Sequence, residues 1–170
     1  MDVLLNRRSV RKYDSTKKIS RQDLEMLCRY AEAAPSARNQ KSRCYIVVDD
    51  QAVLNQLATC SNHAKFLTQA AAVIAVIAAD ADTLPTPHMQ VQDLAATTQN
   101  LLLKATEQQI GSCWIGIYPV EERMRRCDEI LFVPSNMHTF ALVALGYPQD
   151  ENRFFDAEKW SDTLLHHNRY

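Results

Sequence analysis

Residues 72–79 read AVIAVIAA, an apolar run in which polar and apolar side chains do not alternate. A run that is apolar on both faces is typical of a central β-strand that other elements cover on each side. It is too short to cross a membrane as a helix, which takes about 20 apolar residues. The stretch therefore predicts the buried middle of a sheet that lies between layers of helices.

Helical and strand patterns surround this run. The strongest helix is predicted over residues 87–110, where apolar side chains recur on one face and Gly111 stands in the position of a C-terminal cap. An earlier helix is predicted to begin after Ser20, an N-cap with Asp23 three residues on, and to end at Pro35. Further helices are predicted at 2–6, 53–58, around 66–67 and at 121–131, and further strands at 44–48, 113–117 and 139–145. Because helices and strands are interleaved without a regular βαβ order, the predicted class is α+β with a central mixed β-sheet flanked by helices.

Length, charge and cysteine content restrict the function classes. The 170 residues predict one domain over the whole chain, and the net charge of −1 argues against general nucleic-acid binding. The five cysteines are odd in number and form no C-x-x-C pair, and no signal peptide is recognisable. We therefore expect reduced thiols in a cytoplasmic protein, with neither a membrane nor a nucleic acid as partner.

Side chains that could catalyse a reaction by themselves are scarce. No G-x-S-x-G motif is present, and the five histidines do not pair with cysteine or histidine at the spacing of metal ligands. We expect no metal site and no catalytic side chain. If the protein is an enzyme, a cofactor carries the reaction.

The basic segment at residues 7–11, Arg-Arg-Ser-Val-Arg, is a candidate phosphate site. The three glycines of the chain fit neither of the usual glycine-rich phosphate loops. Three guanidinium groups and one hydroxyl supply donors that match phosphate oxygens. The alternative interpretation of this segment by itself is a solvated basic turn.

Three segments occur in a characteristic order. They are RRSVRKY at 7–13, AAPSARN at 33–39, and a third segment at 93–116 that contains DLAA, QNLLL and GSCWIG. With GYP at 146–148 and an arginine-bearing tail, they make the chain resemble the nitroreductase family of FMN-dependent oxidoreductases. The resemblance is collinear from residue 5 to residue 148.

The resemblance implies an intertwined homodimer with FMN bound at the subunit boundary. It assigns contacts with the phosphate, ribityl chain and pyrimidine edge of FMN to Arg7, Arg8, Ser9 and Arg11. It places Pro35, Ser36 and Asn39 on the flavin of the partner subunit, and Ile115 and Gly116 against the isoalloxazine ring near N5. Arg153 is implied to complete the phosphate site, and Lys65 to approach the N1–C2 edge of the ring.

The implied activity is two-electron transfer by a ping-pong mechanism. NADH or NADPH would be the donor, and a nitroaromatic, a quinone or a similar small molecule the acceptor. The alternatives are an FMN carrier or sensor without turnover, a family variant with dehydrogenase or dehalogenase chemistry, and a structural dimer without cofactor. Lys41-Ser42-Arg43 replaces the Gln-Pro-Trp common in the family, and its two cations suggest an anionic substrate or nicotinamide phosphate.

Overall fold

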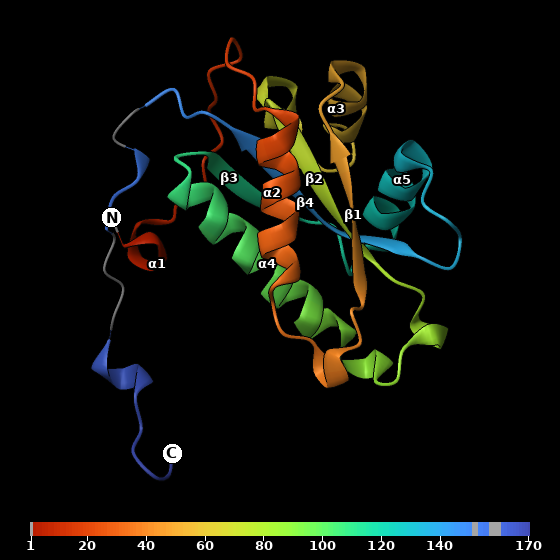
Figure 1. The fold of residues 1–170 in the computed structure, drawn as a ribbon, viewed down its shortest axis with the longest axis vertical. Helices are drawn as coiled ribbons and strands as arrows, with labels where there is room; N and C mark the ends of the chain where they lie inside the picture. The colour runs from red at the N-terminus through yellow and green to blue at the C-terminus, as the bar shows by residue number, and fades with distance from the viewer. Residues whose placement is uncertain (1, 151–152, 157–160) are drawn as a thin grey trace.

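The computed structural model describes residues 2–150, 153–156 and 161–170. A four-stranded sheet forms its centre, with the order β1-β2-β4-β3 (Figure 1). The strands are β1 (Arg43–Val48), β2 (Ala72–Ala78), β3 (Gly111–Gly116) and β4 (His138–Gly146). The apolar run at residues 72–79 forms β2, which lies in the interior of the sheet as predicted.

Both faces of β2 are buried because each meets a different hydrophobic core. Val73, Ala75 and Ile77 pack with side chains of α3 (Gln51–Leu57) and α5 (Glu121–Leu131). Ile74, on the opposite face, packs with side chains of α2 (Arg21–Glu32) and α4 (Gln90–Glu107). Figure 1 shows α2 and α4 crossing one face of the sheet while α3 and α5 lie on the other side. The α+β class and the flanking helices are confirmed.

The sheet is antiparallel at all three of its strand pairings. Strands β2 and β3 run in the same direction, but β4 lies between them, so no two neighbouring strands are parallel. Among the described residues, the parallel pairing expected of a mixed sheet occurs only at an isolated bridge between Ser9 and Ser112. That bridge brings the basic segment alongside β3.

The short elements follow the predicted chemistry. The N-cap of α2 is Ser20, whose hydroxyl accepts a hydrogen bond of 3.1 Å from the Asp23 amide, as predicted. A short helix, α1 (Val3–Asn6), precedes the basic segment. Single 3₁₀ turns lie at Ala37–Asn39, Lys65–Gln69, Ala81–Thr83, Pro87–Met89 and Asp162–Leu164.

The predicted boundaries of the long helix are wrong at both ends. Residues 87–89 form a 3₁₀ turn, and the helix α4 ends at Glu107. Gln109, with a φ of 58°, takes the left-handed position that was assigned to glycine. Gly111 instead begins β3, where a Cβ would lie 2.9 Å from the side chain of Val10. Glycine is therefore required for close strand packing at this position.

Candidate functional site

The basic segment is fixed to the edge of the sheet by its apolar neighbours. The Val10 amide donates a hydrogen bond of 2.9 Å to the Ser112 carbonyl, and the buried Tyr13 hydroxyl donates one of 2.7 Å to the Val10 carbonyl. Tyr13 also forms an antiparallel bridge with Pro148. The arginines at 7, 8 and 11 are thereby held next to β3 and the start of the tail.

Two cavities meet at Arg11. The first, of about 480 Å³, is lined by Arg11, His63, Phe66, Cys113, Trp114, Ile115, Gly116 and Arg123. The second, of about 400 Å³, is lined by Arg11, Lys12, Pro148, Gln149, Asp150 and Arg153. Both volumes are in the range of small-ligand sites. The structure therefore brings Arg11 together with Ile115 and Gly116 on one side and with Arg153 on the other.

Arg8 has two buried donor atoms that could bind an anion. Its Nη1 atom donates to the Arg7 carbonyl at 2.6 Å, and its guanidinium lies 4.7 Å from the centre of the Phe155 ring. Its Nε and Nη2 atoms are buried and have no hydrogen-bond partner among the described residues. Within the same part of the chain, none of the arginines at 7, 8, 11 and 153 has a carboxylate within 4.0 Å. Because buried donors without partners are costly, this arrangement favours a bound anion such as a phosphate.

The first cavity offers a surface for a planar group. A Cβ added at Gly116 would meet nothing within 4 Å, so the end of β3 presents bare backbone to open space. Phe66 and Trp114 supply aromatic surface nearby. The pKa of the Cys113 thiol is raised by burial, so this thiol is neutral near pH 7 and a poor nucleophile. The cavity is suited to binding rather than to protein-side covalent catalysis.

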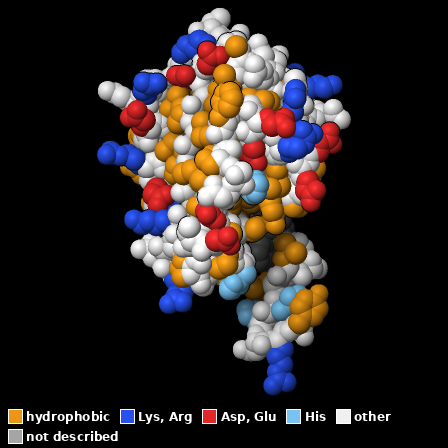
Figure 2. All heavy atoms as spheres, turned by 90° about the vertical axis from the view of Figure 1, so that its right-hand side faces the viewer, with side chains coloured by type: hydrophobic (Ala, Val, Ile, Leu, Met, Phe, Trp, Pro, Cys, Tyr) orange, Lys and Arg blue, Asp and Glu red, His pale blue; other side chains and the backbone are white. Residues whose placement is uncertain are grey.

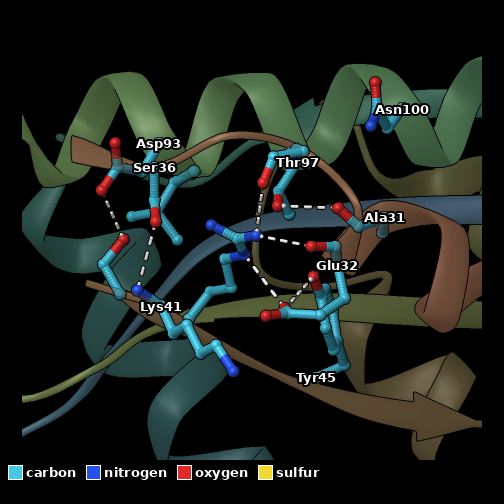
Figure 3. Close-up of polar contacts among 12 residues, drawn as sticks. Ala31, Glu32, Ser36, Lys41, Tyr45, Asp93, Thr97 and Asn100 are labelled. Carbon is cyan, nitrogen blue, oxygen red and sulfur yellow. Dashed lines mark hydrogen bonds and ion pairs between the residues drawn. The ribbon is translucent and has the colours of Figure 1, made fainter. Parts of the chain in front are cut away.

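The turn at 35–39 lies apart from these cavities in the single chain. It is held by Asp93 of α4, which accepts hydrogen bonds of 2.9 Å from the Ala37 amide, 2.7 Å from Gln40 Nε2 and 2.9 Å from the Ser42 hydroxyl. Figure 3 shows Asp93 and Ser36 beside the turn. Pro35, Ser36 and Asn39 line neither cavity at Arg11. The two groups of predicted residues are therefore separate within one subunit.

A larger hollow of about 700 Å³ lies between α5 and the start of β4. Figure 2 shows this side of the molecule, where apolar side chains form a stripe bordered by charged ones. Four of its polar lining residues pair with one another, Arg125 with Glu129 at 2.8 Å and His138 with Asp128 at 3.1 Å. None of the predicted site residues lines it, so size alone does not identify the functional site.

Comparison with known proteins gives the family. The sequence profile of the nitroreductase family matches residues 4–61 and 56–147. A protein of Archaeoglobus fulgidus, described as a candidate NADH dehydrogenase/NAD(P)H nitroreductase, is 38% identical over 172 residues, which cover 100% of this chain and 98% of that protein. The chain belongs to the nitroreductase family.

Solved structures agree with this assignment. A candidate NADH oxidase of Clostridium acetobutylicum is 35% identical and superposes with a TM-score of 0.92, covering 99% of this chain and 100% of that one. An FMN-dependent nitroreductase of Clostridium difficile is 26% identical, with a TM-score of 0.83 and coverage of 99% and 98%. The expected family and its fold are thus confirmed over nearly the whole chain.

One departure from the nitroreductase pattern has a structural explanation. The Arg43 side chain is 2% exposed and pairs with Glu32 at 3.1 Å. It also donates hydrogen bonds of 2.9 Å to the Glu32 carbonyl and 2.8 Å to the Ala34 carbonyl. Arg43 therefore closes the C-terminal end of α2. The expectation of two substrate-binding cations at this point is therefore wrong for Arg43. Of the two cations, only Lys41 is exposed.

Several residues that line the first cavity were not predicted from the sequence. His63, Phe66 and Arg123 line the first cavity, whereas the predicted Lys65 is exposed and does not. His63 lies in the turn before the 3₁₀ segment that holds Phe66, and Arg123 lies on α5, so no local motif marks the three. Among the described residues, no group of three His, Cys, Asp or Glu side chains is placed to hold a metal ion. None of the described helices has the length and apolar composition that a membrane crossing requires.

Proposed function

We propose that this nitroreductase-family protein is an FMN-dependent oxidoreductase. It carries two electrons from NADH or NADPH to a small acceptor, such as a nitroaromatic or a quinone. The single observation that supports this most is Arg8, whose buried Nε and Nη2 atoms lack partners within the described structure. An FMN phosphate supplies the anionic oxygens that these donors need. Family relatives support the same cofactor, since one is named an FMN-dependent nitroreductase.

Arg8, which lines neither cavity, and the residues that line the two cavities have separate tasks in this proposal. Arg8 and Arg153 would hold the phosphate, and Arg11, which lines both cavities, would bind the polar edge of the ring system. Gly116 and Ile115 would support the ring by backbone contact, because nothing occupies the space beside Gly116. When bound, FMN supplies the hydride-transfer chemistry. A single cavity for donor and acceptor implies that they bind in turn, with ping-pong kinetics.

The proposal includes a homodimer. Pro35, Ser36 and Asn39 lie away from the cavities of their own chain, which fits a role at the site of a partner subunit. Large apolar side chains are exposed on α1 and α2, among them Leu4, Leu5 and Tyr30. The cytoplasmic location stays a prediction.

The first test is the visible absorbance of the purified protein before and after anaerobic NADH or NADPH. We expect flavin bands that bleach on reduction and return when an acceptor is added. Flavin bands that do not bleach with either nucleotide would favour the carrier or sensor alternative. A colourless protein that cannot be loaded with FMN would refute the proposal.

A variant tests the role of Arg8 directly. Arg8→Gln keeps a polar side chain but removes the charge, and we expect the Kd for FMN to rise roughly 10- to 150-fold, the effect of losing a hydrogen bond to a charged group. Arg21→Gln, an exposed position at the start of α2, is the control and should leave the Kd unchanged. Equal FMN affinity in both variants would show that Arg8 does not bind the phosphate.

A further inference from the structure

The first cavity has more basic side chains than the cofactor explains. Three basic side chains line it, Arg11, His63 and Arg123, and no aspartate or glutamate lines it among the described residues. The proposed function uses Arg11 for FMN. Arg123 and His63 remain, and both come from elements outside the family segments on which the cofactor assignment rests.

Arg123 stands at the point where the open backbone of β3 ends. Its Nη1 atom donates a hydrogen bond of 3.0 Å to the Gly116 carbonyl. This hydrogen bond fixes one edge of the guanidinium. Within the described structure, no carboxylate lies within 4.0 Å of the Arg123 guanidinium, so its other edge is not paired with one. A fixed guanidinium with free donors is suited to bind a carboxylate through two hydrogen bonds.

The position of Arg123 in α5 is unfavourable for the helix itself. Arg123 is the third residue of α5 and follows Glu121 and Glu122. The first turn of a helix carries partial positive charge, which favours those two carboxylates and disfavours a cation. Local helix stability therefore does not explain an arginine here, whereas a ligand in the adjoining cavity does.

We propose that Arg123 is a specificity-determining residue that binds an anionic group of the electron acceptor, with His63 as a second donor in the same cavity. This inference rests on the proposed function. The acceptor class is a small aromatic compound that bears a carboxylate. Phe66 and Trp114, which line the same cavity, provide the aromatic surface for its ring.

The same two side chains could instead bind a phosphate of the nicotinamide donor, and the experiment separates the acceptor's carboxylate from that phosphate. Steady-state KM values are measured for 4-nitrobenzoate, for its neutral isostere 4-nitrobenzamide, and for NADH and NADPH. Equilibrium binding of both nitro compounds to the FMN-loaded protein is measured by calorimetry, which does not depend on turnover. The variants are Arg123→Gln, which can still donate to the Gly116 carbonyl, and Arg123→Lys, which keeps the charge.

For Arg123→Gln we expect a rise of roughly 5- to 10-fold in the KM and Kd for 4-nitrobenzoate, and less than a twofold change for 4-nitrobenzamide. Arg123→Lys should recover part of the loss. Arg125→Ala is the matched control, because Arg125 lies on the same helix, is exposed and pairs with Glu129 outside this cavity. It should change none of these values.

Three results would overturn the inference. Equal losses of affinity for the two nitro compounds in Arg123→Gln would show that Arg123 has a purely structural role. No loss of affinity for either compound would show that Arg123 has no role in binding them. A rise confined to the KM of NADH or NADPH would assign the cations to the donor phosphate. Failure of the proposed function looks different, because the wild-type protein would then bind no FMN or reduce neither compound.

Discussion

Asp93 is a buried carboxylate, 5% exposed, whose hydrogen bonds run to the turn that precedes β1. Burial raises the pKa of Asp93, but hydrogen bonds from Gln40, Ala37 and Ser42 outweigh this effect, so the pKa lies below its ordinary value. The turn contains three left-handed residues other than glycine, Arg38, Asn39 and Lys41. Such backbone conformations persist where surrounding contacts fix them, and Asp93 provides those contacts.

The first residue-scale prediction concerns Asp93→Asn. An amide cannot accept all three hydrogen bonds, so we expect the free energy of unfolding at pH 7 to fall by about 2 kcal/mol. Since the pKa in the folded state is lowered, ionised Asp93 stabilises the fold above about pH 4 and loses this effect as the pH falls through the folded-state pKa. Urea unfolding from pH 7 to pH 3 should therefore show a weaker pH dependence in the variant.

Asp49→Asn is the control for this prediction, because Asp49 is exposed and lies outside the turn. It should unfold like the wild-type protein across the same pH range. If Asp93→Asn also behaved like the wild type, the hydrogen bonds of Asp93 would not be what holds the turn.

The three glycines of this chain all lie at the ends of strands β3 and β4. A Cβ at Gly146, the last residue of β4, would lie 2.7 Å from the Tyr13 ring, and one at Gly111 would lie 2.9 Å from the Val10 side chain. Both glycines let the basic segment pack directly on the ends of β3 and β4. The Cβ position of Gly116 is open instead. The glycines of one sheet thus serve two different purposes, close packing at two sites and an open surface at the third.

The element-scale prediction compares two of these glycines. Gly146→Ala forces the buried Tyr13 ring to move, and we expect it to lower the free energy of unfolding by about 2 kcal/mol. Gly116→Ala should change stability by less than about 0.5 kcal/mol, as at an ordinary exposed position. It should nevertheless weaken FMN binding, because its methyl group enters the space proposed for the ring.

Thermal unfolding and FMN titration of both variants check this pair of outcomes. Unchanged FMN affinity in Gly116→Ala would argue against a ring packed on the end of β3. A stable Gly146→Ala would show that the contact with Tyr13 relaxes at little cost.

At the scale of the whole molecule, the described tail and α1 lie away from the sheet (Figure 1). The side chains of residues 161–170 are exposed, and Leu4 and Leu5 of α1 are 67% and 52% exposed. Exposed apolar side chains of this size are typical of surfaces that a partner covers. The proposed homodimer gives both segments a surface to bury.

We therefore expect light scattering at micromolar concentration to give twice the mass of the chain. Replacing both Leu4 and Leu5 by glutamate should shift the protein towards monomer on dilution and lower its FMN occupancy. Phe132→Ser is the control, because Phe132 is 91% exposed but lies at the end of α5. A stable wild-type monomer with FMN bound would contradict the dimer.

The sequence could predict the site only where its residues are close together along the chain. The basic segment at 7–11 was identified from its own arginines and the GSCWIG strand through the family resemblance, and the structure brings Arg11, Ile115 and Gly116 to one cavity. Arg123 and His63 were missed, because their place at this cavity depends on the packing of distant elements. Arg43 was misjudged, since only the fold shows that the end of α2 needs its guanidinium.

By itself, the sequence determined the elements and the layers of this protein. Periodicity and capping residues such as Ser20 act over a few residues, so the run at 72–79 was sufficient to predict a central strand between helices. The tertiary structure alone decided the antiparallel order of the strands, the structural role of Gly111 and the lining of the first cavity. These features depend on contacts between residues far apart in the chain, and such contacts are fixed by packing rather than by local pattern.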